Sequence, residues 1–452
     1  MKRVFKLYLI VLGFLFSACH KDFLDERSSK SLVVPETLQD YQALLDNTGV
    51  MNVQGHSSVV MDGDFEFLES AIVGQSATTR NSYLWKVDIY ETLLSTPSWT
   101  YPYKQILPSN IVIEGLKKIS PGGTSQMEYN ALLGSAYFFR AFAFHELAVL
   151  FSAPYQENIA ELTPGLPLKL SADVTQIVQR STLKATYDQI IADLNIAIDL
   201  LPNEQPVISR PIKAAAYAQL SRVNLNMGRF EDALSNAKEA LKLRNELLDY
   251  NKIVISTSRT FAHPFTTPNP EILFWARDNF GVNNSSTFLV KQSLYDSYAS
   301  NDLRKSRFFT AARRFIGTYT GLSQSLCGLT TREVYLIAAE CEARSNKTNE
   351  ALDYLNTLCQ KRYDGTFVGY QSSDAEQVLH WVLEERRKEL VTVRRWEDLR
   401  RLNLDSRFAQ TLTRTYLGEL YNLPPKSSRY VLAIPQGEIS ESGITQNERK
   451  LD

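Results

Sequence analysis

The stretch IKAAAYAQLSRVNLNMGRFEDALSNAKEALKL, from Ile212 to Leu243, carries the strongest structural signal in this 452-residue chain. Apolar residues recur at helical spacing on both sides of the turn-forming sequence MGRF. Small side chains at Ala215, Ala218 and Ala233 would allow the two helices to pack closely. The stretch therefore predicts a helical hairpin.

A second stretch, REVYLIAAECEARSNKTNEALDYLNTLCQKR from Arg332 to Arg362, repeats this arrangement, with EAL where the first stretch has DAL. Both stretches resemble tetratricopeptide hairpins. Chain with little helical pattern separates them, so the sequence does not predict a simple tandem solenoid. We expect a mostly α-helical fold, with tetratricopeptide-like hairpins at about 99–243 and 331–402 and a loop-rich insert at about 251–330.

The sequence before the first hairpin is also largely helical. The segment EYNALLGSAYFFRAFAFHELAVLF (128–151) is apolar nearly all round, which predicts a central helix. The segment TLKATYDQIIADLNIAIDLLP (182–202) predicts an amphipathic helix that ends at its proline. Residues 48–97, in contrast, are rich in Gly, Ser, Asp and aromatic side chains and predict loops.

The N-terminus has the pattern of an export signal. Basic residues are followed by the uncharged run 7–18, which suits a signal peptide and is shorter than the roughly 20 residues that span a membrane. Ser17 and Ala18 precede Cys19, an arrangement similar to the lipobox of bacterial lipoproteins. We predict a cleaved signal at 1–18, a lipidated Cys19, a flexible leash at 19–30 and a body at 31–452. An ordinary secretory signal with an incidental cysteine is the alternative.

The overall composition disfavours several classes of function. The chain has 49 basic and 50 acidic residues, so no charge excess favours nucleic acid or an anionic membrane. The body contains three cysteines without CxxC spacing, Cys327, Cys341 and Cys359, which argues against a disulfide framework or a structural zinc site. We interpret them as small buried side chains, and a single bridge between Cys341 and Cys359 stays open as an alternative.

No catalytic motif stands out either. The sequence HELAV begins at His145 but has Val149 where the metalloprotease pattern needs a second histidine, so we interpret His145 as structural. GxSxG and Gly-rich phosphate loops are absent from the sequence. The charge-rich stretch 384–401 mixes acids and bases at helical spacing, which favours a solvated or internally paired helical face. We therefore predict a protein that is not an enzyme.

Several segments, in order along nearly the whole chain, carry a family resemblance: CHKDFLDE, SAYFFRAFAFHELAVLF followed by SAPY, RSTLKATYDQIIADLNIAIDLLP, REVYLIAAECEAR, ERRKELVTVRRWEDLRRLN and RYVLAIPQGEISESGITQN. Together they resemble the SusD/RagB family of outer-membrane nutrient-binding lipoproteins of Bacteroidetes. The resemblance implies a surface-exposed lipoprotein that captures a glycan, an oligosaccharide or a peptide and serves as the lid of a SusC-like TonB-dependent β-barrel transporter. It implies no cofactor.

The chain departs from this family at one turn. The segment ELVTVRRW lacks the glycine of the Glu-Gly pair that the family commonly has there, and it is one residue shorter. We expect a rebuilt turn near Arg394. The chain is also compact for the family, which points to trimmed loops, where ligands are usually held.

Aromatic and polar side chains in the two loop-rich regions suggest a ligand site. Flat aromatic rings stack on the apolar face of a sugar, and polar side chains bond its hydroxyl groups. Local packing is the alternative interpretation of each aromatic residue. The candidate ligand residues are Asp62, Asp64, Arg80, Tyr83 and Trp85 in the first region and Trp275, Arg277, Phe280 and Tyr295 in the second.

Two functional hypotheses follow. In the first, the aromatic loops form the ligand-binding region of a nutrient-capturing lipoprotein. In the second, the helical hairpins serve as a scaffold of an outer-membrane complex without a small ligand. Aromatic side chains that line an open groove would favour the first hypothesis, and aromatic loops buried against the body would favour the second.

Overall fold

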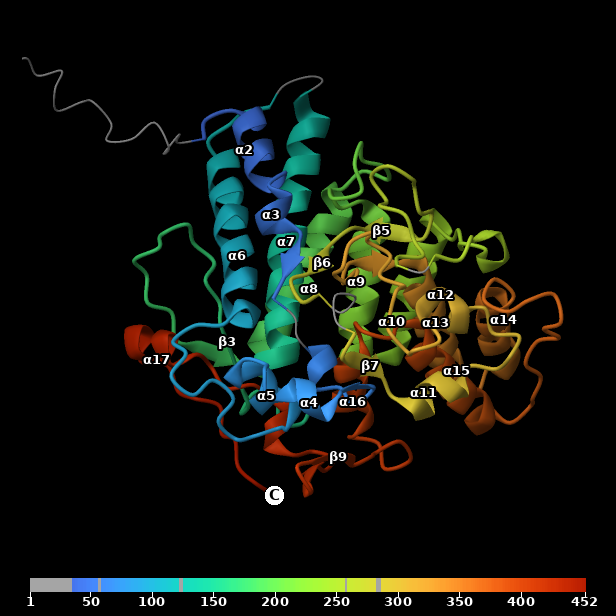
Figure 1. Ribbon diagram of the computed structural model, residues 1–452. Coiled ribbons are helices and arrows are strands. Elements are labelled where there is room, and N and C mark those ends of the chain that lie inside the picture. Colours follow the sequence, from blue (N-terminus) through green and yellow to red (C-terminus); the bar gives the residue numbers. More distant parts are fainter. Residues whose placement is uncertain (1–34, 56–57, 122–124, 257, 282–285) are drawn as a thin grey trace, which may run out of the picture.

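The computed structural model describes residues 35–55, 58–121, 125–256, 258–281 and 286–452 (Figure 1). The described residues form many helices and a few two-stranded sheets, which confirms the mostly α-helical fold. Among them, no helix is both long and apolar enough to span a membrane. The predicted signal, Cys19 and the predicted leash lie outside the described residues.

A layer of long helices forms the first part of the core. It contains α2 (Leu38–Leu45), α6 (Pro97–Leu116), α7 (Ser125–Phe151) and α8 (Leu183–Leu200). Helix α7 is buried over most of its length between α6 and α8, as its apolar sequence predicts. Figure 1 shows α2, α6 and α7 side by side. Within this layer, Arg140 forms a buried ion pair with Asp193 at 2.7 Å.

Both predicted hairpins form. The first pairs α9 (Lys213–Asn226) with α10 (Phe230–Leu243), and Gly228 supplies the left-handed turn with φ of +74°. The second pairs α13 (Thr331–Arg344) with α14 (Thr348–Cys359), and Asn346 takes the turn at φ +59°. Helix α10 packs on α13, so two hairpins that are distant in sequence lie side by side.

Short strands join the two loop-rich regions. Strand β1 (Val53–Gln54) runs parallel to β6 (Arg277–Asp278), and β2 (Phe65–Phe67) runs antiparallel to β7 (Phe288–Val290). Segments more than 200 residues apart therefore share backbone hydrogen bonds. The remaining elements of these regions are α3 (Thr48–Met51), η3 (Ser58–Val60), α4 (Glu69–Ile72), α5 (Ala77–Tyr83), η4 (Tyr250–Lys252), β5 (Ile272–Phe274), α11 (Gln292–Ser297), α12 (Arg304–Phe308) and β8 (Leu329–Thr330).

The charge-rich stretch lies largely inside the protein, where its charged side chains form ion pairs with other residues of the chain. Helix α15 (Ala375–Glu389) ends at Glu389, whose carboxylate accepts from Arg362 Nε at 2.9 Å and Arg304 Nη1 at 3.2 Å. Arg332 Nη1 lies 3.4 Å from the same carboxylate. The internally paired alternative is therefore confirmed.

The other late elements are α16 (Arg395–Leu402), β9 (Leu412–Tyr416), β10 (Glu419–Leu423), η6 (Ser428–Tyr430) and α17 (Gln436–Ser442). Two short strands, β3 (Pro164–Pro167) and β4 (Arg180–Thr182), precede α8.

The turn that lacks the family glycine is strained. Thr392, between α15 and α16, has φ of +84°, a conformation that a β-branched residue rarely adopts. Its hydroxyl lies 2.9 Å from that of Ser325, which helps to hold it there. The three body cysteines are buried and free, as the sequence predicts, without a bridge between Cys341 and Cys359.

Candidate functional site

The prediction that Tyr83 and Trp85 are exposed stacking platforms is wrong. Their side chains are only 6% and 2% exposed. The guanidinium of Arg414 lies over both rings, 3.6 Å from the centre of Tyr83 and 4.6 Å from that of Trp85. Trp85 also donates through Nε1 to the carbonyl of Met61 at 2.9 Å. These rings stabilise a buried arginine by cation–π contact and are not accessible to a ligand.

Asp62 and Asp64 are also buried, so neither can reach a ligand from the surface. Asp64 accepts from Arg387 Nε at 3.0 Å and lies 3.5 Å from Arg395 Nε. Burial raises the pKa of Asp62 to about 8, and the adjacent charge of Asp64 acts in the same direction. Burial also acts to raise the pKa of Asp64, but Arg387 and Arg395 outweigh it, so this pKa is lowered.

The other predicted residues lie in different environments. Trp275 is buried, which contradicts its expected exposure, and Arg277 is half-buried on β6. Tyr295 is half-buried on α11, with Lys305 Nζ 4.6 Å from its ring centre. Arg80 on α5 donates to two nearby backbone carbonyls at 3.4 Å each. The structure does not bring these four side chains together around one cavity.

Where the two loop-rich regions meet, a cavity of about 260 Å³ opens, termed here the loop cavity. Phe280 is the predicted ligand residue that lines it, and its half-buried ring packs edge-on against Phe288 with 5.9 Å between ring centres. Its backbone N–H donates to Asp278 Oδ1 at 2.9 Å, which fixes the local chain. The lining residues are Gly55, Met61, Ser76, Thr78, Thr79, Ser82, Ile89, Tyr90, Leu93, Ser95, Thr96, Pro97, Ser98, Asn279, Phe280 and Leu432.

The walls of the loop cavity contain buried hydroxyl groups with few partners. The hydroxyls of Tyr90 and Thr96 lie close together and make no hydrogen bond with the rest of the described chain. The hydroxyl of Thr78 on α5 is likewise buried and without a partner among the described residues. Burial raises the pKa of Tyr90, which keeps this hydroxyl protonated and able to donate. Unsatisfied buried hydroxyls beside apolar walls are suited to a small polyhydroxylated ligand.

These hydroxyl residues are not among those predicted from the sequence. They lie in the loop-rich stretch 48–97, where the residues predicted to bind a ligand were aromatic and charged residues. The available signal was the hydroxyl-rich run SATT at 76–79, which opens α5, with Ser76 capping the helix by accepting from Thr79 N–H at 3.2 Å.

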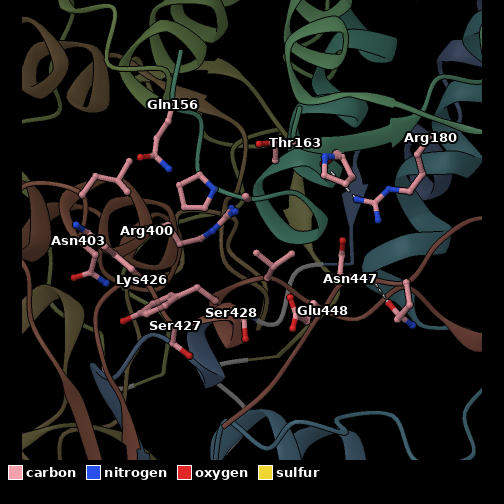
Figure 2. Close-up of a pocket in the computed structure, with 17 residues that line it drawn as sticks. Gln156, Thr163, Arg180, Arg400, Asn403, Lys426, Ser427, Ser428, Asn447 and Glu448 are labelled. Atoms are coloured by element: carbon pink, nitrogen blue, oxygen red, sulfur yellow. Dashed lines mark hydrogen bonds between the residues drawn. The ribbon is translucent and has the colours of Figure 1, made fainter. Parts of the chain in front are cut away.

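A larger cavity of about 470 Å³, termed the arginine cavity, lies elsewhere on the molecule (Figure 2). It is bordered by the loop after α7, by β3 and β4, by the end of α16 and by two late segments. Its lining residues are Ala153, Pro154, Gln156, Thr163, Pro164, Arg180, Arg400, Asn403, Leu404, Lys426, Ser427, Ser428, Tyr430, Val431, Gln446, Asn447 and Glu448. None of the predicted ligand residues is among them.

His145 takes no part in either cavity. It is fully buried, with Gln219 Nε2 at 3.1 Å from Nδ1 and Asn226 Nδ2 at 3.2 Å from Nε2. Burial lowers its pKa to about 4, so the ring is neutral at pH 7. This environment agrees with its interpretation as a structural residue.

Comparisons with known proteins cover most of the chain. Residues 22–225 match the family described as "Starch-binding associating with outer membrane", and residues 331–449 match the SusD family. SusD-like protein P2 of Formosa agariphila is 30% identical over 141 residues. This match spans 31% of the chain and only 26% of the length of that relative.

Solved structures share the fold. A SusD superfamily protein of Bacteroides thetaiotaomicron superposes with a TM-score of 0.72 at 22% identity, over 91% of this chain and 100% of the other. A SusD-like carbohydrate binding protein of Bacteroides vulgatus gives a TM-score of 0.70 at 17% identity, over 92% and 99% of the two chains. With two consecutive matches to SusD families and the same fold over nearly its whole length, the chain belongs to the SusD family.

Proposed function

We propose that this protein is a carbohydrate-binding lipoprotein of the outer membrane that captures an oligosaccharide in the loop cavity and passes it to a SusC-like TonB-dependent transporter. Cys19 is its proposed lipid attachment point and the cell exterior its proposed location. A peptide is the second ligand class that family membership suggests. The protein is proposed to bind its ligand without chemical change.

The observation that carries this proposal is the set of hydroxyls in the walls of the loop cavity that bond no described residue outside the set. Each of the hydroxyls of Thr78, Tyr90 and Thr96 can donate to and accept from a sugar hydroxyl. Phe280 and Leu93 supply apolar surface on the same walls. The cavity volume of about 260 Å³ lies just below the roughly 300–1,000 Å³ of small-molecule sites, which suits one sugar ring of a longer chain.

The expected affinity is low. One ring face that buries ~60–100 Å² of apolar surface contributes ~1.5–2.5 kcal/mol before ordering costs. Two or three hydrogen bonds add about 1 kcal/mol each. The sum of roughly 3.5–5.5 kcal/mol corresponds to a Kd from about 3 mM to about 0.1 mM, which is compatible with release to a transporter.

Exposed apolar side chains near the loop cavity support a partner on this face. Leu93 on the cavity wall and Leu94 beside it are 48% and 65% exposed. Leu417, at the tip of the β9–β10 hairpin, is also exposed, and its backbone N–H donates to Glu69 Oε1 at 3.0 Å, at the start of α4. Apolar side chains gathered on one face favour protein contact. We propose that this face lies against the barrel, so that the captured sugar faces the transporter.

The test is calorimetry of the soluble chain, residues 20–452, against a panel of neutral oligosaccharides and peptides. For any ligand found, Phe280→Ala should weaken binding about tenfold or more, because the stacking surface is lost. Tyr90→Phe should weaken it about fivefold, because one hydrogen bond is lost. Phe265→Ala, which removes a partly exposed ring outside the cavity, is the control and should leave the Kd unchanged. A ligand that binds all variants equally would show that the loop cavity is not the site.

A scaffold function without a small ligand is the second candidate, and the burial of Trp85 and Trp275 favours it. It predicts that the protein copurifies with a β-barrel partner while no oligosaccharide or peptide binds. Copurification that is weakened by Leu94→Asp, together with an empty ligand panel, would support the scaffold over the capture protein.

A further inference from the structure

The arginine cavity contains a buried positive charge without a counter-ion. Arg400 is 5% exposed and makes no salt bridge within the described part of the chain. Its guanidinium donates to the backbone carbonyl of Ser152, just after α7, and its Nε has no partner among the described residues. A buried cation normally has a carboxylate partner, because removal from water is costly.

Neighbouring acids do not neutralise Arg400 directly. Glu397, one turn earlier on α16, is bonded to Arg394 and accepts from Asn226 Nδ2 at 3.3 Å. Burial lowers the pKa of Arg400 to about 10, with Tyr187 and Glu397 opposing the shift, so the group stays charged at neutral pH. Arg400 therefore holds a full positive charge at the wall of a cavity.

A second arginine lines the same cavity. Arg180 on β4 donates only to backbone carbonyls, of Gly165 at 2.9 Å, Thr445 at 3.0 Å and Pro164 at 3.3 Å, and forms no salt bridge with a described residue. Burial lowers its pKa as well. Figure 2 shows Arg180 and Arg400 extending into the cavity from opposite sides.

The remaining charged groups of the lining leave the cavity positive. Lys426 is exposed at the rim and forms no salt bridge within the described residues. Glu448 is the acidic lining residue, and it is largely exposed and paired with Lys450 at 3.3 Å. Two arginines and a lysine thus face one carboxylate that already has its own partner.

We propose that the arginine cavity is a second ligand site, distinct from the loop cavity, that binds a small carboxylate-bearing molecule. A carboxylate accepts two parallel hydrogen bonds from one guanidinium, and each arginine retains N–H groups that no described residue uses. The volume of about 470 Å³ accommodates a ligand of one or two rings. A uronic acid unit of an acidic glycan and the terminal carboxylate of a peptide share this chemistry.

A purely structural explanation exists for Arg400, which could serve only to bond the carbonyl at the end of α7. That role uses one nitrogen and requires neither a cavity nor a second unpaired arginine. The two explanations differ in a measurable way, because a structural arginine does not respond to added carboxylates.

The first measurement is an NMR titration of the ¹⁵N-labelled soluble chain, residues 20–452, which contains every described residue. D-galacturonate should shift the Arg400 Nε–H signal, whereas D-galactose, which lacks the carboxylate, should not. N-acetylglycine and N-acetylglycinamide form the matching pair for the peptide carboxylate. The acid that binds more tightly identifies the source of the carboxylate. Signals that respond to neither acid, or equally to the acids and their neutral counterparts, would overturn the proposal.

Variants locate the site. Arg180→Gln and Arg400→Gln should each weaken the binding of the acid about tenfold or more, because a charge-assisted hydrogen bond is lost. Arg259→Gln removes an exposed guanidinium that also bonds a backbone carbonyl, and should leave binding unchanged. If Arg400→Gln fails to fold, as judged by circular dichroism, Arg180→Gln and Lys426→Gln carry the test. Full binding in both of those variants would overturn the proposal.

Discussion

Glu389 should be among the most sensitive positions in the protein, because three buried arginines share its carboxylate. Arg362, Arg304 and Arg332 lie 2.9, 3.2 and 3.4 Å from its oxygens, and Glu389 itself is 1% exposed. Burial alone would raise the pKa of Glu389, but the arginines outweigh it and the pKa is lowered. The substitution Glu389→Gln keeps the shape of the side chain and removes the charge that balances these cations.

The size of the effect follows from the cost of an uncompensated buried charge. Removal of one member of a buried ion pair typically costs 3–5 kcal/mol. With an unfolding entropy of ~2.1 cal/mol/K per residue over about 430 residues, 1 kcal/mol corresponds to a shift of roughly 1 °C in Tm. We therefore expect Glu389→Gln to lower the Tm by about 3–5 °C.

Differential scanning calorimetry at pH 7 measures this shift. The matched control is Glu384→Gln on the same helix, because Glu384 is exposed and only approaches His380 at 3.7 Å. The control should change the Tm by less than about 1 °C, as expected for a surface pair. If Glu389→Gln melts within 1 °C of the parent protein, or if both variants fall by the same amount, the buried network does not stabilise the fold as argued.

Three further predictions concern the interior. Thr392→Gly should be more stable than Thr392→Ala by about 1–2 kcal/mol in urea unfolding, because glycine relieves the strain at φ +84° that alanine retains; equal stability would contradict the strain. The thiols of Cys327, Cys341 and Cys359 are buried, and burial raises their pKa. Ellman's reagent should therefore not label them in the native protein and should label them after unfolding. Rapid labelling of the native protein would contradict their burial. Three buried glutamates have a folded pKa near 2, below the unfolded value of about 4.3: Glu333, Glu340 and Glu385. Their contribution to stability is complete above the unfolded pKa and is lost as pH falls toward 2, so a drop from pH 6 to pH 3 should lower the urea-unfolding free energy by roughly 1.5–2 kcal/mol for each of them. An unfolding free energy that does not change with pH would contradict this prediction.

The sequence predicted the helical part of the fold well because that part depends on local patterns. The hairpins on either side of Gly228 and Asn346 follow from apolar spacing and turn residues that lie within about 30 positions of each other. The charge-rich stretch 384–401 was predictable as internally paired, but the identity of the partners was not. Arg304 and Arg362, for example, reach Glu389 from distant segments that no local pattern connects.

The candidate site could be predicted only as a region. The loop-rich stretches were recognisable from composition, and Phe280 does line the loop cavity. Trp85 was misjudged because a tryptophan in a polar loop looks exposed, whereas here Arg414 from β9 lies against its ring. Only the fold brings residue 414 to residue 85, so no inspection of the flanking sequence would have revealed the burial.

The late segment around Asn447 has a consequence for the order in which parts of the protein fold. Asn447 Nδ2 donates to the carbonyls of Phe151 at 2.7 Å and Leu432 at 2.8 Å, and Arg449 Nε donates to that of Val87 at 3.0 Å. Contacts this distant in sequence form slowly, whereas helical hairpins form early from local contacts. During synthesis, the helical framework can therefore assemble first, while the arginine cavity gains its last wall only when residues 446–448 have arrived. A chain interrupted before that point would retain stable hairpins and an unfinished cavity, so helix content alone would not report completion of the fold.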